Sequence, residues 1–144
     1  MTQKTITENK IKLTGIDHIA LNVHDMDRSI QFYQDVLGFK VVTKDTTQSG
    51  FKHYELDAGN VFIALFEQPD FNFQAAQKVM TNDGFLHFAF AAHKDHLATT
   101  LEALKENGVE LDGKPRNHGN GTSIYFYDPD GHHVEIHFPN EQRP

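Results

Sequence analysis

The chain contains no cysteine, no cluster of lysine and arginine, and no long apolar run. The missing cysteine excludes disulfides, thiolate metal ligands and a cysteine nucleophile, and it fits a reducing compartment. The net charge of −7 argues against nucleic acid and anionic membranes as partners. No segment is apolar for long enough to span a bilayer, and the polar N-terminus lacks the apolar core of a signal peptide. These absences predict a soluble, cytoplasmic protein.

What the chain does contain is enough to build an interior. Hydrophobic residues make up 38% of the sequence and twelve are phenylalanine, so a folded domain or two small modules with a common core are expected. Ten histidines are many for 144 residues, and composition alone therefore cannot nominate metal ligands. Five of them lie in predicted turns or polar surroundings and are expected at the surface: His24, His53, His93, His96 and His132.

The same pattern occurs twice along the chain, a histidine on an apolar strand that leads into an amphipathic helix. Aligning His18 with His87 also aligns Ala20 with Ala89. This predicts an internal duplication of a strand–helix–strand–strand–strand unit. Each unit alone has a one-sided sheet with too little core, so the two sheets are expected to curl around a shared cavity or to pair with another chain.

The expected organisation is an N-terminal tail, two modules joined by a linker, and a C-terminal tail, at residues 1–12, 13–68, 69–83, 84–138 and 139–144. Hydrophobic periodicity and turn signals predict the strands Ile16–Val23, Phe39–Thr43, Phe51–Asp57, Val61–Glu67, Phe85–Ala91, Val109–Leu111, Thr122–Tyr127 and His133–Phe138. One helix is expected between a cap at Asp25 or Asp27 and a stop at Gly38, and another over Asp95–Glu106.

Two histidines and one carboxylate occupy positions where core side chains would be expected. His18 and His87 lie on equivalent predicted strands, and Glu135 lies between Val134 and Ile136 on the last strand. Taken singly, each is more often a hydrogen-bonded core or surface residue than a ligand. Together, three buried ionisable groups without a charge partner would be costly, and a divalent cation removes that cost. Imidazole and carboxylate suit Fe, Mn, Zn, Ni or Co, and three protein ligands leave positions open for substrate.

The duplication also indicates whether a fourth ligand exists. The strand of the first unit that corresponds to the Glu135 strand places Ala64 at the matching position. Glu67 has the opposite strand parity and is expected to point away. The predicted site therefore has three protein ligands.

Three motifs are distributed along the chain: Asp17–Ala20, Ser29–Tyr33 with Leu37–Phe39, and Ser123–Ile136. On these motifs, the stretch Leu13–Phe138 resembles the vicinal oxygen chelate superfamily, which includes glyoxalase I, extradiol dioxygenases, fosfomycin resistance proteins and bleomycin-binding proteins.

The resemblance implies an α+β fold in which paired βαβββ modules form a curled mixed sheet around a metal-containing cavity. It implies one divalent metal ion per site, held by His18, His87 and Glu135, with Fe2+ or Mn2+ favoured and Zn2+, Ni2+ or Co2+ as alternatives. It further implies a small-molecule substrate and a homodimer, in which each site often draws ligands from both chains.

The subfamilies differ in detail, and extradiol-dioxygenase-like chemistry ranks first by a small margin. Tyr125 matches a tyrosine that precedes the glutamate in those enzymes, and His118 lies close to the position of a further histidine. We therefore take Tyr125 and His118 as the catalytic candidates. His137 shares strand parity with Glu135 and is a candidate lining residue.

Three other readings remain open. Fosfomycin-resistance-type opening of an epoxide by thiol or water is suggested by the similarity of Pro115–Phe126, although Ala20 and the scarcity of cations besides Lys114 and Arg116 weigh against a phosphonate site. Glyoxalase-type isomerisation is disfavoured by Ala64. The third alternative is a metal-free protein that binds and sequesters a small molecule in the same cavity.

Overall fold

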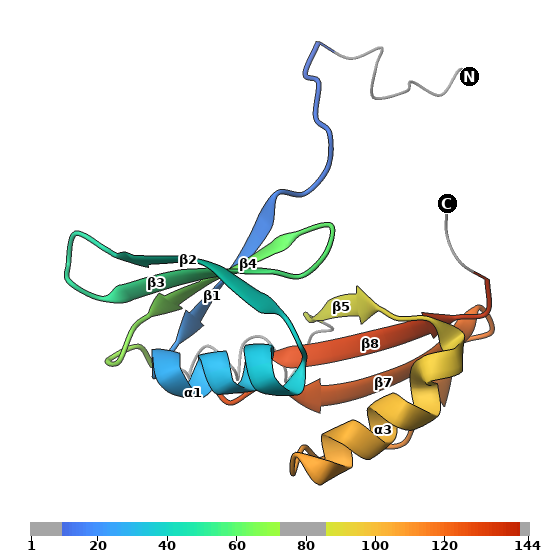
Figure 1. The fold of residues 1–144 in the computed structure, drawn as a ribbon. Helices are drawn as coiled ribbons and strands as arrows, with labels where there is room; N and C mark the ends of the chain where they lie inside the picture. The colour runs from blue at the N-terminus through green and yellow to red at the C-terminus, as the bar shows by residue number, and fades with distance from the viewer. Residues whose placement is uncertain (1–9, 73–85, 142–144) are drawn as a thin grey trace.

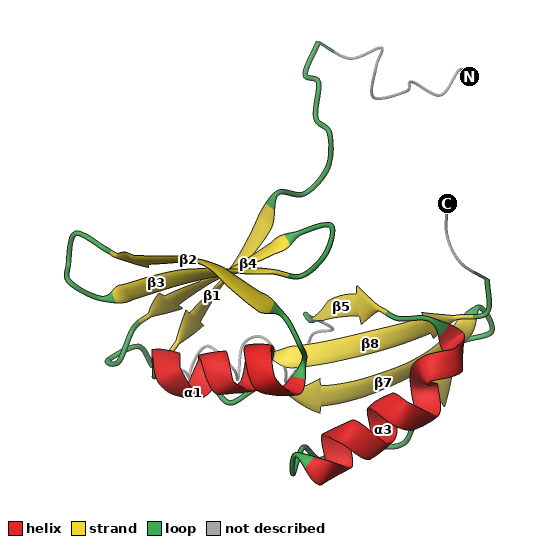
Figure 2. Cartoon of the chain, in the orientation of Figure 1, coloured by secondary structure: helices red, strands yellow, loops and turns green. Residues whose placement is uncertain are grey.

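The computed structural model describes residues 10–72 and 86–141, which form two four-stranded sheets with one helical segment along a face of each (Figures 1 and 2). The first half contains β1 His18–Val23, α1 Met26–Ile30, a π-helical continuation η2 Gln31–Val36, β2 Lys40–Thr46, β3 Lys52–Asp57 and β4 Phe62–Glu67. The second half contains β5 Phe88–Ala91, the 3-10 turn η3 Lys94–His96, α3 Leu97–Glu106, β6 Arg116–Asn117, β7 Gly121–Tyr127 and β8 His133–Pro139. The predicted α+β class with two sheets of the same plan is confirmed.

The two sheets have the same strand order, β1-β4-β3-β2 in one and β5-β8-β7-β6 in the other. In each, the first strand runs parallel to the last strand of its half, and the remaining pairs are antiparallel. Ala20 is opposite Ala64, and Ala89 is opposite Glu135, at equivalent places in the two sheets. The prediction that Ala64 stands where the second module has its carboxylate is therefore confirmed.

Local chemistry determines where the first helix begins and ends. The side chain of Asp25 accepts a hydrogen bond from the backbone N–H of Arg28, which caps the N-terminus. Glu67 accepts a second one, from the backbone N–H of Met26 at 2.9 Å. Glu67 thus faces the helix and away from the concave face of the sheet, as its strand parity predicts. At the other end, Gly38 has a φ of 83° and terminates the helix.

The helix is not a regular α-helix throughout. From Gln31 to Val36 it widens into a π-helical segment, and the N–H of Leu37 bonds to the carbonyl of Phe32. A π segment accommodates an extra residue per turn and rotates the residues after it about the helix axis. The apolar residues of the helix, Met26, Ile30, Tyr33 and Leu37, nevertheless all lie in or against the core. Tyr33, in this segment, is fully buried and contacts the second half of the chain.

One apolar core joins the two halves. Its fully buried members include Val23, Met26, Tyr33, Leu56, Ile63, Leu65, Ile124, Phe126 and Val134. Phe32 links the core residues of the two halves, because the centre of its ring lies 6.1 Å from that of Phe126 and 5.2 Å from that of Tyr33. The opposite, concave faces of both sheets carry polar residues, and these are the faces that bear the predicted ligands.

Two strand predictions are corrected by the structure. β5 begins at Phe88, so His87 directly precedes the strand. Val109–Leu111 is not a strand, because only Leu111 pairs, through a single bridge to Phe126. The chain then turns at Gly113 (φ 81°), and the edge strand is β6. The predicted linker lies mostly outside the described residues, as do most of the N-terminal tail and half of the C-terminal tail. No helix of the described ranges is long and apolar enough to cross a membrane.

Candidate metal centre and its surroundings

A cavity of about 520 Å³ opens over the concave face of the second sheet. Its walls include Glu135 and His137 from β8, Tyr125 from β7, and His118 from the loop before β7. Strand periodicity explains the grouping, since Tyr125 is paired with Glu135 and alternate residues of β7 and β8 face the same side.

His87 and Glu135 lie together in the described structure. His87 Nε2 is 2.9 Å from Glu135 Oε1, and Glu135 is 8% exposed. An imidazole nitrogen and a carboxylate oxygen are part of the donor set that first-row divalent metals prefer. The donor set and the open cavity beside it fit such an ion.

His18 lies on the other sheet, at the start of β1, and its side chain is 51% exposed. Within one chain it does not join His87 and Glu135 in a three-ligand cluster, among the residues that the structure describes. Its Nδ1 is 2.8 Å from the carboxylate of Asp17. A neighbouring carboxylate commonly fixes the ring of a metal-binding histidine through the nitrogen that does not bind the metal. The contact of Nδ1 with Asp17 leaves Nε2 as the nitrogen of His18 suited to bind a metal.

The two catalytic candidates form a pair. His118 Nε2 is 2.9 Å from the hydroxyl oxygen of Tyr125. Burial and the charge of Glu135 raise the pKa of the Tyr125 hydroxyl above its ordinary value, so Tyr125 keeps its proton at neutral pH and can donate it in a hydrogen bond. The guanidinium carbon of Arg116 lies 5.3 Å from the centre of the Tyr125 ring, which brings a positive charge next to the pair.

Ser123, which the sequence pattern did not single out, lies behind Glu135. This fully buried side chain places its hydroxyl 2.6 Å from Glu135 Oε2 and 2.7 Å from His137 Nδ1. The sequence feature that could have pointed to Ser123 is its spacing of two residues from Tyr125, which puts both side chains on the cavity side of β7. The neighbouring Gly121 lies against the next strand: a Cβ there would be 2.4 Å from the carbonyl oxygen of Phe138 and 3.0 Å from His137 Cε1.

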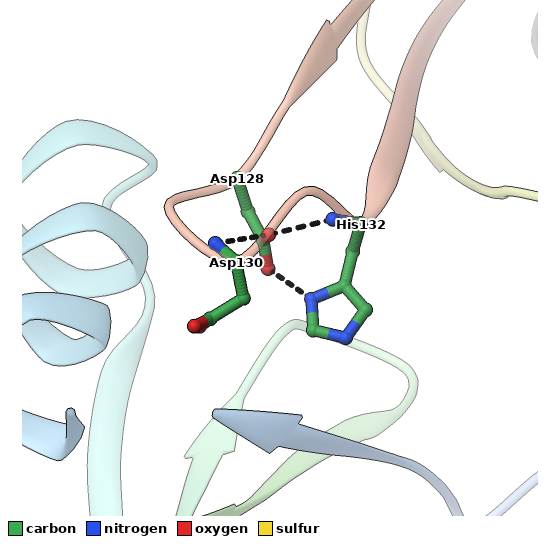
Figure 3. A group of neighbouring side chains, drawn as sticks. All are labelled: Asp128, Asp130 and His132. Atoms are coloured by element: carbon green, nitrogen blue, oxygen red, sulfur yellow. Dashed lines mark hydrogen bonds and ion pairs between the residues drawn. The ribbon is translucent and has the colours of Figure 1, made fainter. Parts of the chain in front are cut away.

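A second group of ionisable side chains occurs at the β7–β8 turn, where Asp128, Asp130 and His132 bring ligand atoms within 4.8 Å of one another (Figure 3). Their oxygens are already engaged by protein donors. Asp128 accepts hydrogen bonds from the Tyr33 hydroxyl, from His132 Nδ1 and from the backbone N–H groups of residues 130 and 132.

Asp130 in turn accepts from Arg28 at 2.9 Å, from Ser29 at 3.2 Å and from the backbone of His24. These bonds run between the first helix and the β7–β8 turn. We call the group the inter-module clasp, consisting of Arg28, Ser29, Tyr33, Asp128, Asp130 and His132. Because its carboxylates are satisfied by the protein, it connects the two modules and does not resemble an open metal site.

The clasp corrects the surface assignment of His132, whose side chain is only 12% exposed. Burial lowers the pKa of His132, but the hydrogen bond and charge of Asp128 and the charge of Asp130 outweigh burial and raise it above its ordinary value. His53, also expected at the surface, is 22% exposed and stacks on Phe66 with ring centres 4.1 Å apart.

The paired βαβββ plan, with a histidine–glutamate pair beside a cavity, defines a class of small α+β proteins. Residues 15–136 match the family model of the glyoxalase/bleomycin resistance protein/dioxygenase superfamily. The chain belongs to this superfamily, as the sequence motifs predict.

Three known proteins similar to this chain indicate which activities occur among its relatives. The chain is 34% identical to a metallothiol transferase FosB of Staphylococcus epidermidis, over 88% of this chain and 83% of the relative. A crystal structure of a variant of the fosfomycin resistance protein FosX from Listeria monocytogenes, with Mn(II) and 1S,2S-dihydroxypropylphosphonic acid, has a TM-score of 0.72 and 27% identity, over 89% of this chain and 94% of that one. A glyoxalase/dioxygenase from Nostoc punctiforme has a TM-score of 0.74 and 25% identity, over 98% and 100%.

The prediction that the chain is an enzyme is confirmed by these relatives. They favour the fosfomycin-resistance alternative over the extradiol-dioxygenase reading that ranked first on the sequence.

Proposed function

We propose that the protein is a divalent-metal-dependent enzyme that opens the epoxide of a small phosphonate, such as fosfomycin, by adding a thiol. The observation that carries the proposal is the His87–Glu135 pair at 2.9 Å, beside the cavity that Glu135 lines, in a chain 34% identical to a metallothiol transferase. The metal ligands would be His18, His87 and Glu135, and the bound ion, with Mn2+ or Fe2+ preferred, would supply Lewis acidity toward the epoxide oxygen.

The residues of the chain have separate tasks in this reaction. The sulfur of the thiol forms a bond to one epoxide carbon, the carbon–oxygen bond breaks, and the proton of the thiol ends on the released oxygen. Tyr125 donates a hydrogen bond toward that oxygen, and His118, 2.9 Å from the Tyr125 hydroxyl, orients it. Arg116 supplies positive charge beside Tyr125 for the anionic phosphonate.

We further propose that the site is completed by a second copy of the chain. β1 and β5 are the edge strands of their sheets, and each begins at or directly after a predicted histidine ligand, His18 or His87. Pairing the first sheet of one protomer with the second sheet of its partner would bring these histidines together and remove two open edges.

Exposed apolar residues support this dimer. The segment before β1 extends away from the body of the protein (Figure 1), with Ile11, Leu13 and Ile16 at least 67% exposed. Apolar side chains grouped in this way typically mark an interface. A groove of about 880 Å³ continues from Ile16 to Phe88, alongside the start of β5.

A mixing experiment tests the shared site. His18→Ala and Glu135→Ala variants should each be inactive alone, because every site lacks a ligand. Unfolded together and refolded, they would form mixed dimers with one intact site, and about a quarter of the wild-type activity should return. If all ligands came from one chain, mixing would restore nothing.

The reaction itself is tested by incubating the metal-loaded protein with fosfomycin, with and without a panel of low-molecular-weight thiols, and following phosphorus NMR. A thiol adduct is the expected product. A diol formed without thiol would make water the nucleophile. Unchanged fosfomycin, together with oxygen consumption on a catechol, would overturn the proposal in favour of dioxygenase chemistry.

A further inference from the structure

We propose that Ser123 and His137 are positioning residues that hold the carboxylate of Glu135 in the orientation needed to bind the metal. This inference rests on the proposed metal site and adds two residues to it. Neither residue is a ligand in the proposal, and both act through Glu135.

The direction of the hydrogen bonds follows from counting hydrogens. A carboxylate only accepts, so the single hydroxyl hydrogen of Ser123 goes to Glu135 Oε2, 2.6 Å away. The hydroxyl oxygen must then accept from His137, which requires a hydrogen on Nδ1, 2.7 Å away. The result is a chain from His137 through Ser123 to Glu135, in which each donor has one acceptor.

This series of hydrogen bonds gives the two oxygens of the Glu135 carboxylate different partners. Oε2 is held by the fully buried Ser123, and Oε1 is left facing His87 Nε2 at 2.9 Å. A free carboxylate would rotate about its terminal bond and would have to be ordered when the ion binds. Because Ser123 has already fixed the rotation, that ordering is complete before binding.

Ser123 is also the polar anchor of the His137 ring. Within the described ranges, His137 Nε2 is buried and makes no hydrogen bond, so Nδ1 alone orients the ring. Gly121 leaves room for the ring, since His137 Cε1 lies where a side chain at position 121 would begin. Ser123 thus connects the carboxylate of Glu135 to the ring of His137.

The test is the affinity of the substrate-free protein for Mn(II), measured by the electron paramagnetic resonance signal of the free ion. Ser123→Ala should weaken Mn(II) binding about 10–100-fold, the usual effect of removing a residue that orients a metal ligand. Ser29→Ala is the matched control, since Ser29 is equally buried and its hydroxyl also bonds to a carboxylate, that of Asp130 in the clasp. It should leave the affinity within about twofold of wild type.

Variants at His137 provide a second route if Ser123→Ala does not fold. His137→Asn keeps a donor near the position of Nδ1 and should retain most of the affinity, whereas His137→Leu should lose it to a similar extent as Ser123→Ala. The proposal is overturned if Ser123→Ala, or His137→Leu in its place, binds Mn(II) as the wild type does while retaining its melting temperature. A wild-type protein that binds no Mn(II) would instead overturn the metal site on which the proposal rests. Neither result depends on whether the protein turns over fosfomycin.

Discussion

The hydroxyl of Tyr33 donates a 2.5 Å hydrogen bond to the carboxylate of Asp128, across 95 positions of sequence and between the two modules. Both side chains are buried, and Tyr33 is fully enclosed. Burial and the negative charge of Asp128 raise the pKa of Tyr33 well above its ordinary value, so the hydroxyl is always a donor. The first helix is therefore tied to the β7–β8 turn by a bond that is out of contact with water.

Replacing Tyr33 by Phe should lower the free energy of unfolding by about 1.5–3 kcal/mol, because a buried carboxylate loses a donor. Urea denaturation measures the change. Tyr127→Phe is the control, since its hydroxyl is 3.3 Å from the exposed carboxylate of Asp112, and it should lose less than about 1 kcal/mol. Equal losses in the two variants would contradict the importance of the clasp.

Arg28→Gln should also destabilise the protein. Its partner Asp130 has a side chain that is 1% exposed, so the lost ion pair leaves a desolvated charge, and a loss of about 3 kcal/mol is expected. Lys52→Gln removes an exposed pair with Asp27 at 3.5 Å and should change stability by less than about 1 kcal/mol. Thermal unfolding of both variants compares them, and a larger loss for Lys52→Gln would refute this account.

His132 should make stability depend on pH. Its pKa is raised in the folded state, so its charged form stabilises the fold below the ordinary value of 6.5. This contribution disappears as the pH rises through the folded-state pKa. His132→Gln keeps a donor toward Asp128 but no charge. The stability advantage of wild type over this variant should be larger at acidic pH than above neutrality in urea titrations, and a difference that grew with pH would reverse the assignment.

The Tyr125–His118 pair should affect turnover without affecting metal binding. Tyr125→Phe removes the proposed donor and is expected to reduce kcat by about 100-fold or more. Mn(II) affinity should stay near that of the wild type because the three ligands are retained. Tyr127→Phe, two residues along the same strand, should leave kcat unchanged. A Tyr125→Phe protein with normal kcat would remove this residue from the proposed chemistry.

The sequence predicted features that depend on the strict alternation of strands. The position of Ala64 as the equivalent of Glu135, and the direction of Glu67 toward the first helix, follow from a period of two that tertiary contacts rarely change. The duplication of the two modules was visible for the same reason, because His18 and His87 mark equivalent edge strands.

The features that the sequence did not predict depend on contacts between distant segments. The Asp128-Pro129-Asp130-Gly131 stretch forms a turn, and its carboxylates bind Arg28 and Tyr33, which local pattern analysis cannot connect to it. The π-helical segment was missed because helical periodicity assumes regular turns. Ser123 carries no strong signal as a residue type, and only its place beside Glu135 and His137 gives it a role.

Gly121 limits how this enzyme could change. Its Cα faces the carbonyl of Phe138 so closely that even a methyl group would overlap with the backbone. The preceding loop, which carries His118 and Asn120, is exposed and lines the cavity mouth. Laboratory evolution toward new substrates can therefore vary the loop but not Gly121, the first residue of β7. Every descendant would keep this close approach of β7 to β8, whichever compound the loop came to accept.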